Sequence, residues 1–318
     1  MPENSQEFSG IFTSRIDGVS YAPHLALARL SARLADSYPF AKVQAAVTGG
    51  ASKKPAKRLD LISPLGAHPA VAAAVAHLRA DAKGARVMLI VVATGREAED
   101  TAAALRAFDP AAEILEFASW ETLPHERLSP SAETVGKRLR VLHRLHELGG
   151  GSGTKTHPAS AQSVAAPDLD HNVYVIASVR AVLQPVVAGL ADHPPLRFIT
   201  QKEYFLPELT LKLVENAYHR VDMVTKRGEF AVRGGIVDIF PTTAEHAMRL
   251  EFFGDELEEI RQFSVTDQRT LTELPDHGRL AEFTVYPARE IIITPAVAQR
   301  ARQMLHEFPT ISTMLAKI

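Results

Sequence analysis

The stretch RGEFAVRGGIVDIFP, residues 227–241, decides the fold of the second half of this chain. Phe230 and Val232 would lie on one side of an extended backbone and Arg233 on the other. This period of two predicts a β-strand with one face in a core. Two glycines at 234–235 follow, and they favour a bulge or a close backbone approach before the next strand. Arg233 is therefore either an ordinary strand residue facing water or part of a binding surface.

The segment MRLEFFGDELEEI, residues 248–260, shows the same alternation. Met248 and Leu250 share one face of the predicted strand, and this apolar face predicts a core. Arg249 and Phe253 share the other face, where we expect them to meet solvent about 13 Å apart. Arginine and phenylalanine exposed together are typical of protein-interface anchors. The alternative is a sheet covered on both sides, with Phe253 in a core.

The first part of the chain alternates between helical and strand patterns. Apolar residues at helical spacing predict helices at residues 23–36, 68–82, 95–108 and 131–148. Short apolar runs predict strands at residues 59–63, 85–94, 112–119 and 172–179. This β–α alternation indicates a parallel sheet flanked by helices. From about Phe198, strands joined by short turns follow. The predicted fold class is α/β, with a parallel-sheet domain and a second, smaller α+β domain that contains an antiparallel sheet.

Composition excludes several classes of protein. The chain has 318 residues, a formal net charge of -2 and no cysteine. Without cysteine there is no disulfide, thiolate metal site or cysteine nucleophile, and a reducing cytoplasm is the expected location. The longest apolar stretch, VMLIVVA at residues 87–93, is too short to cross a bilayer, so no membrane association is expected. The near-neutral charge gives no general attraction to nucleic acid.

Two glycine-containing loops match a phosphate-binding site only in part. A phosphate loop requires G-x-x-x-x-G-K-[ST] between a strand and a helix. VTGGASKK, residues 47–54, has no glycine directly before its lysines and no serine or threonine after them. LISPLGAHPAVAAAV, residues 61–75, has the strand–loop–helix order around Gly66, but no lysine follows. We therefore expect no nucleotide cofactor.

Other candidate sites are weaker still. His143 and His146 stand one turn apart on a predicted helix, but no further ligand stands at a recognised metal-site spacing. A solvated surface pair is expected there, and no metal. We also find no serine nucleophile motif, so no catalytic residue is assigned.

Two segments bear on the domain organisation. Residues 149–168, GGGSGTKTHPASAQSVAAPD, contain almost nothing that could form a core, and they predict a flexible segment. The sequence stops soon after a predicted helix at residues 295–308. We therefore expect the sequence to be part of a longer protein.

Five segments, taken together and in this order, resemble one protein family. They are SWETLPHERLSPSAETVGKRLRVL (119–142), VIASVRAVLQP (175–185), RVDMVTKRGEFAVRGGIVDIFP (220–241), MRLEFFGDELEEIRQFSVTDQRTL (248–271) and YPAREIIITP (286–295). They resemble the N-terminal, UvrB-homologous part of the bacterial transcription-repair coupling factors (Mfd). The same segments are similar to the corresponding part of the nucleotide excision repair protein UvrB.

The resemblance implies three domains. Residues 1–197 would form domain 1a, a helicase-motor-like domain with a degenerate nucleotide site. Residues 198–284 would form domain 2, which binds UvrA, and residues 285–318 would begin domain 1b. UvrB has an intact phosphate loop at the position of Gly66, whereas the coupling factors do not, which agrees with the missing lysine.

The resemblance also implies a function and a site. Arg233, Arg249 and Phe253 match the family's UvrA-binding residues in type and position. The expected function is a non-enzymatic module that recruits UvrA and links stalled transcription to nucleotide excision repair. RNA polymerase and DNA would bind regions of the full-length protein outside this chain. The alternative is a nucleotide-dependent DNA-remodelling enzyme of the UvrB type, and the missing lysine after Gly66 argues against it.

Overall fold

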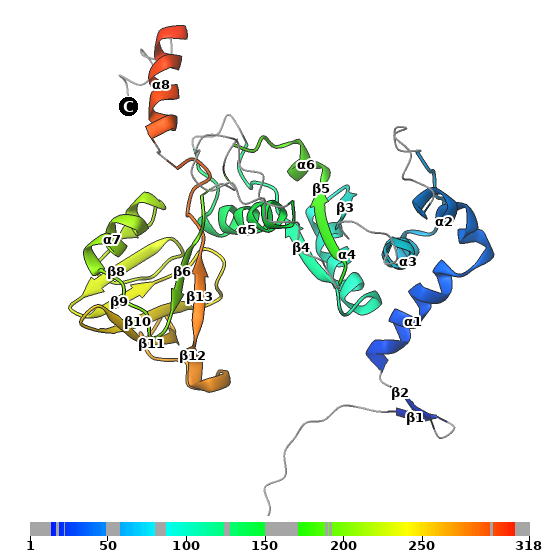
Figure 1. Ribbon diagram of the computed structural model, residues 1–318, viewed down its shortest axis with the longest axis horizontal. Helices are drawn as coiled ribbons and strands as arrows, with labels where there is room; N and C mark the ends of the chain where they lie inside the picture. The colour runs from blue at the N-terminus through cyan, green and yellow to red at the C-terminus, as the bar shows by residue number, and fades with distance from the viewer. Residues whose placement is uncertain are drawn as a thin grey trace, which may run out of the picture. The chain divides into compact units, whose positions relative to one another are not determined.

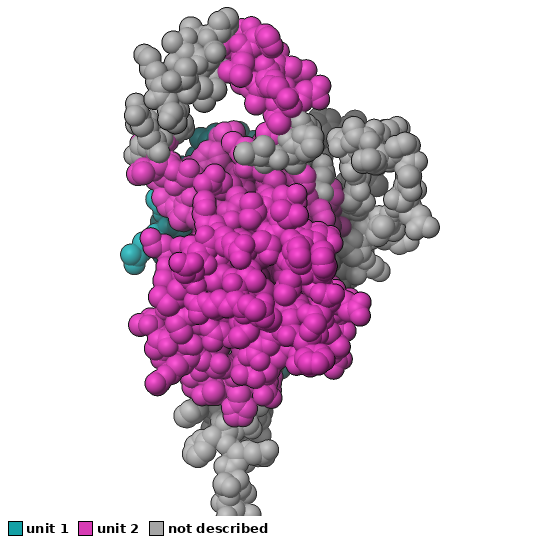
Figure 2. Space-filling view, turned by 90° about the vertical axis from the view of Figure 1, so that its left-hand side faces the viewer, with its two compact units in different colours: residues 1–119, 163–183 teal, residues 120–162, 184–318 magenta. Residues whose placement is uncertain are grey.

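The computed structural model describes residues 14–16, 19–21, 23–48, 58–79, 87–123, 128–149, 171–187, 190, 193–292 and 295–308. The chain forms two compact units (Figure 2). The first comprises Met1–Ser119 and Ser163–Leu183, and the second comprises Trp120–Gln162 and Gln184–Ile318. The predicted flexible segment, residues 149–168, lies outside the described residues except for Gly149.

The first unit contains a parallel sheet of three strands (Figure 1). Its order is β3 (Val87–Val92), β5 (Val173–Ser178) and β4 (Glu113–Phe117). Every residue of the central strand β5 is buried, which explains its unbroken apolar sequence. Helices α3 (His68–Arg79) and α4 (Gly95–Phe108) pack on one face around Tyr174 and Ile176. The predicted α/β class is confirmed.

The remaining elements of the first unit are mostly helical. They are β1 (Ser14–Ile16), β2 (Val19–Tyr21), α1 (Pro23–Ala35), η1 (Tyr38–Phe40), α2 (Ala41–Thr48), η2 (Leu65–Ala67) and α6 (Val179–Leu183). The strand predicted at residues 59–63 is wrong, because this segment has no strand partner. Ile62 is fully exposed there, so no burial of its apolar side chain would stabilise a β-strand.

The second unit is built on a six-stranded sheet in the order β12-β11-β10-β9-β8-β7. The strands are β7 (His219–Arg220), β8 (Glu229–Arg233), β9 (Ile236–Ile239), β10 (Ala247–Phe253), β11 (Glu256–Phe263) and β12 (Arg279–Leu280). All neighbours are antiparallel except β7 and β8. The two glycines at 234–235 form the turn between β8 and β9, and Gly234 has a φ of 60°, which a glycine adopts without strain. The two strands predicted around these glycines are thus present as a hairpin.

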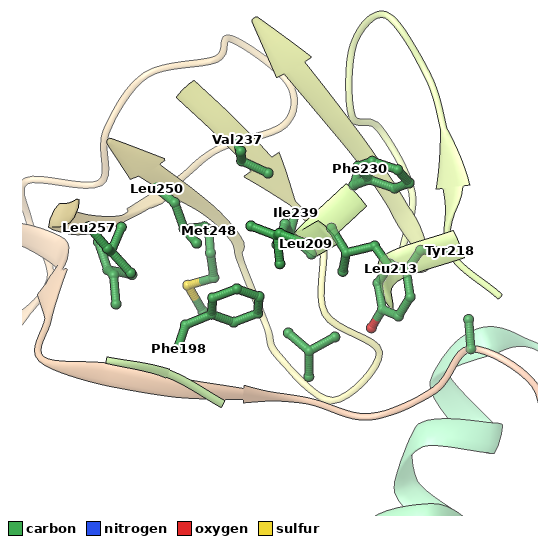
Figure 3. Packing of buried hydrophobic residues seen from close by; sticks show 13 residues of the cluster. Phe198, Leu209, Leu213, Tyr218, Phe230, Val237, Ile239, Met248, Leu250 and Leu257 are labelled. Atoms are coloured by element: carbon green, nitrogen blue, oxygen red, sulfur yellow. The ribbon is translucent and has the colours of Figure 1, made fainter. Parts of the chain in front are cut away.

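One face of this sheet forms the core of the second unit (Figure 3). Phe230, Ile239 and Leu250 point from the sheet towards helix α7 (Leu206–Glu215), which contributes Leu209 and Leu213. The two-stranded sheet of β6 (Leu196–Ile199) and β13 (Glu282–Val285) closes the same core. Complete burial of each large apolar side chain stabilises the fold by about 2 kcal/mol.

Helix α5 (Ala132–Leu148) belongs to the second compact unit. Ser131 caps its first turn by accepting a hydrogen bond from the Thr134 backbone amide at 3.2 Å. Gly136 lies so close to Thr242 that a Cβ atom there would come within 2.3 Å of the Thr242 hydroxyl. The unit also includes η4 (Pro275–Gly278) and α8 (Pro295–Glu307).

These two units divide the chain differently from the domains expected from the resemblance. Domain 1a was to include all residues up to 197, whereas α5 lies in the compact unit that also holds the six-stranded sheet. The domain boundaries at residues 197/198 and 284/285 remain predictions.

Candidate protein-binding surface

The outer face of the six-stranded sheet, opposite its core face, carries the residues that the sequence singled out. Strand register pairs Arg249 with Asp238 on β9 and with Arg261 on β11. Register also pairs Ile236 with Arg233 on β8 and with Glu251 on β10. Because paired residues share a face, Arg233, Arg249 and Phe253 all lie on this side. The outer face comprises Ala231, Arg233, Ile236, Asp238, Ala247, Arg249, Glu251, Phe253, Glu259, Arg261, Phe263 and Arg279. Three of them, Ala231, Ala247 and Phe263, are buried in a small apolar cluster with Val224 and Phe240.

Phe253 is the most exposed aromatic side chain on this face. It is 76% exposed and ends strand β10. The next residue, Gly254, starts the turn to β11 with a φ of 63°. The tight turn fixes the backbone of Phe253 on two hydrogen-bonded strands, so the exposed ring has a rigid base. The prediction that Phe253 meets solvent is confirmed, and the alternative of a core position is wrong.

The guanidinium of Arg249 is bound by other side chains of the same sheet. Its Nε and Nη2 donate to Oδ1 and Oδ2 of Asp238 at 2.7 and 2.9 Å, and its guanidinium lies 4.7 Å from the ring centre of Phe263. The hydrogen bonds to Asp238 raise the pKa of Arg249 above its ordinary value. The expectation that Arg249 simply faces solvent is wrong, because its side chain is only 21% exposed. The bidentate pair neutralises Asp238, whose side chain is 3% exposed.

Arg233 differs from Arg249 in its partners. Its side chain is exposed, and its Nε donates to the backbone carbonyl of Asp222 at 3.1 Å. Among the residues described, no carboxylate lies within ion-pair distance of Arg233. Within the described part of the chain, the charge of Arg233 has no acidic partner, so it could pair with a carboxylate of another molecule.

A second group of charges lies beside Arg249. Arg261 pairs with Glu251 at 3.6 Å and also with Glu259, which in turn binds Arg279. The hydrogen bond from Arg261 lowers the pKa of Glu259, and the charges of Arg261 and Arg279 lower it further. The two arginines and the two glutamates neutralise one another. They therefore make this part of the outer face polar without giving it a net charge.

The two hairpins of this face are locked together at Gly235. The Phe252 amide donates to the Gly235 carbonyl at 2.8 Å. A Cβ atom at Gly235 would come within 2.8 Å of the Phe252 carbonyl oxygen, so the backbones can approach only because this residue is glycine. The close backbone approach predicted for this glycine pair is thus confirmed.

Sequence reasoning did not single out several members of this surface, among them Ile236, Asp238, Glu259, Arg261 and Arg279. The alternation of β9 puts Ile236 and Asp238 on the face opposite its core residues Val237 and Ile239. That signal could have identified them as surface candidates. Their contacts with Arg249 and Glu251 depend on register between strands, which alternation does not give.

The structure also places the phosphate-loop and histidine candidates that the sequence suggested. Gly66 lies in η2 directly before α3, and a Cβ atom there would meet no other atom within 4 Å. His143 is buried beside Tyr286 with ring centres 5.7 Å apart, so the expectation of a solvated histidine pair is wrong for this residue. The described residues contain no cluster of three or more potential metal ligands. None of the helices described combines the length and hydrophobicity that a membrane crossing requires.

Residues 196–290 match the family model of the UvrB interaction domain, and this range contains the entire outer face. The chain is 44% identical to the transcription-repair-coupling factor of Mycobacterium bovis over 269 residues, which is 82% of the chain and 20% of that protein. It is 33% identical to the transcription-repair-coupling factor of Myxococcus xanthus over 72% of the chain and 18% of that protein. This chain belongs to the transcription-repair-coupling factor family.

A second kind of protein is also similar to part of this chain. UvrABC system protein B of Listeria monocytogenes is 37% identical over 95 residues, which is 30% of the chain and 14% of that protein. The chain spans about one fifth of the length of the transcription-repair-coupling factors that it matches. The family resemblance inferred from the sequence is therefore confirmed, within a limited part of these longer relatives.

Proposed function

We propose that this chain is the UvrA-recruiting module of a transcription-repair-coupling factor, and that the outer face of the six-stranded sheet binds UvrA. The exposed Phe253 carries this proposal. It stands on a rigid hairpin within residues 196–290, the range that matches the UvrB interaction domain. A large apolar side chain that a sheet holds in water lowers the free energy of binding when a partner covers it.

Each site residue has a distinct task in this proposal. Phe253 inserts into an apolar pocket of UvrA and loses its contact with water. Arg233 pairs with a carboxylate of UvrA, since its charge has no acidic partner among the residues described. Arg249 is a positioning residue, because Asp238 already occupies two of its donor nitrogens.

The module acts in this proposal by binding and not by catalysis. The loop at Gly66 has no following lysine to neutralise a triphosphate and no adjacent hydroxyl to hold magnesium. Coupling to stalled transcription would come from RNA polymerase and DNA contacts elsewhere in the full-length protein. Calorimetry with Mg-ATP should detect no binding, and micromolar affinity would contradict this part of the proposal.

A titration of UvrA with purified variants tests the assigned surface. Phe253→Ala should weaken binding about thirtyfold, because truncating a buried interface anchor costs about 2 kcal/mol. Leu211→Ala is the matched control: Leu211 is 63% exposed but lies on α7, which covers the other face of the sheet. Equal affinities of wild type and Phe253→Ala would refute the assignment, provided that both melt at the same temperature.

A further inference from the structure

We infer that Ile236 is a second apolar anchor of the outer face, and that one pocket of UvrA covers Ile236 and Phe253 together. The inference rests on the proposed function and names the chemistry of the partner surface. Ile236 was not among the residues that the family resemblance assigned to the site. Its place follows from strand register alone.

The two side chains are diagonal neighbours across strands β9 and β10. Ile236 is paired with Glu251, and Phe253 follows Glu251 by two residues on the same face. Diagonal neighbours in a sheet lie about 7–8 Å apart, within reach of an aromatic side chain. Ile236 is 38% exposed in the chain by itself, so a partner that covers Phe253 can also remove water from Ile236.

The charges around this apolar pair determine what the partner must supply. Asp238 neutralises Arg249, while Glu251 and Glu259 neutralise Arg261. UvrA therefore needs no carboxylate at these positions, and a second acid would meet the repulsion of Glu251 and Glu259. Arg233 is directly paired with Ile236 on the neighbouring strand, and its charge has no acidic partner among the residues described.

The complementary surface follows from this arrangement. It is an apolar pocket wide enough for one aromatic and one branched aliphatic side chain, with a single carboxylate on the Arg233 side of its rim. The lock between Gly235 and Phe252 holds the two anchors at a fixed separation before binding, so little ordering entropy is lost on association.

A double-mutant cycle with UvrA tests the shared pocket. Ile236→Thr keeps the β-branched shape that suits a strand but removes apolar area, and it should weaken binding about fivefold. Phe253→Ala should weaken binding about thirtyfold. The affinity of the double variant should fall clearly less than the product of these factors, because both substitutions remove contacts with the same pocket. Val214→Thr makes the matched change on helix α7, where the side chain is also exposed, and should bind as wild type.

Each outcome of this cycle decides the question. Wild-type affinity of Ile236→Thr, or losses that multiply in the double variant, would overturn the shared pocket while leaving Phe253 as a binding residue. Failure of the wild-type chain to bind UvrA would overturn the proposed function and this inference with it. If Ile236→Thr lowers the melting temperature, Ile236→Val replaces it in the cycle, with an expected loss of about twofold.

Discussion

The core face and the outer face of the six-stranded sheet belong to the same strands, yet they use different interactions. On the core face, Phe230, Ile239 and Leu250 are completely buried against α7 and the β6–β13 pair. On the outer face, the ion pairs of Arg249 and Arg261 lie beside Ile236 and Phe253, which remain partly in water. The first face supplies apolar burial that stabilises the fold, and the second carries ion pairs and the proposed binding groups. The four predictions that follow rank variants of the two faces by their expected effect on stability.

A truncation on the core face should have the largest effect. Phe230→Ala removes a side chain of zero exposure, and the resulting cavity should lower the free energy of unfolding by about 4 kcal/mol. Urea unfolding followed by circular dichroism measures the change. The comparison of faces fails if Phe230→Ala is tolerated while Phe253→Ala destabilises the fold.

Arg249→Ala should rank second, because its guanidinium neutralises the buried carboxylate of Asp238. It leaves the buried carboxylate of Asp238 without its cation, so the free energy of unfolding should fall by about 2 kcal/mol. The double variant Asp238→Asn/Arg249→Ala removes the orphaned charge and should recover part of that loss in the same urea assay. A single variant as stable as wild type would mean that the pair is unimportant for folding.

Gly235→Ala and Gly254→Ala compare a steric clash with backbone strain. Alanine at 235 would press against the Phe252 carbonyl oxygen, so we expect a loss of about 2 kcal/mol and weaker UvrA binding. Alanine at 254 meets no atom within 4 Å but must keep a φ of 63°, which costs about 1 kcal/mol. Thermal unfolding of both variants gives the order. Equal or reversed losses would show that the two hairpins are not locked at Gly235.

The smallest effect should come from the ion pairs of the outer face, and it should depend on pH. The folded chain lowers the pKa of Glu259, so this carboxylate stabilises the fold above its unfolded pKa of about 4.3 and loses that contribution as the pH falls through its folded pKa. Glu259→Gln should therefore cost less than about 1 kcal/mol at pH 7 and almost nothing at pH 3. Urea unfolding at both pH values tests the sign. A difference between variant and wild type that grows in acid would contradict it.

Much of this architecture could be predicted from local sequence. A period of two identified the faces of β8 and β10, and apolar residues at helical spacing predicted α5. The glycines at 234–235 predicted a close backbone approach, which Gly235 makes to Phe252. Each of these signals depends on groups close together in the chain. The same holds for the exposure of Phe253, which follows from alternation beside an apolar face.

Tertiary structure decided the features that depend on distant partners. Arg249 follows Asp238 by eleven residues, and only the β9–β10 register brings their side chains within hydrogen-bond distance. Alternation assigned Arg249 to the outer face. Only the structure showed that the Asp238 carboxylate binds its guanidinium there and turns it away from solvent. Residues 59–63 have a strand-like composition and remain irregular, because a strand is stable only with a neighbour to receive its backbone hydrogen bonds. Sequence thus determined what each segment can form, and the pairing of distant segments determined what it does form.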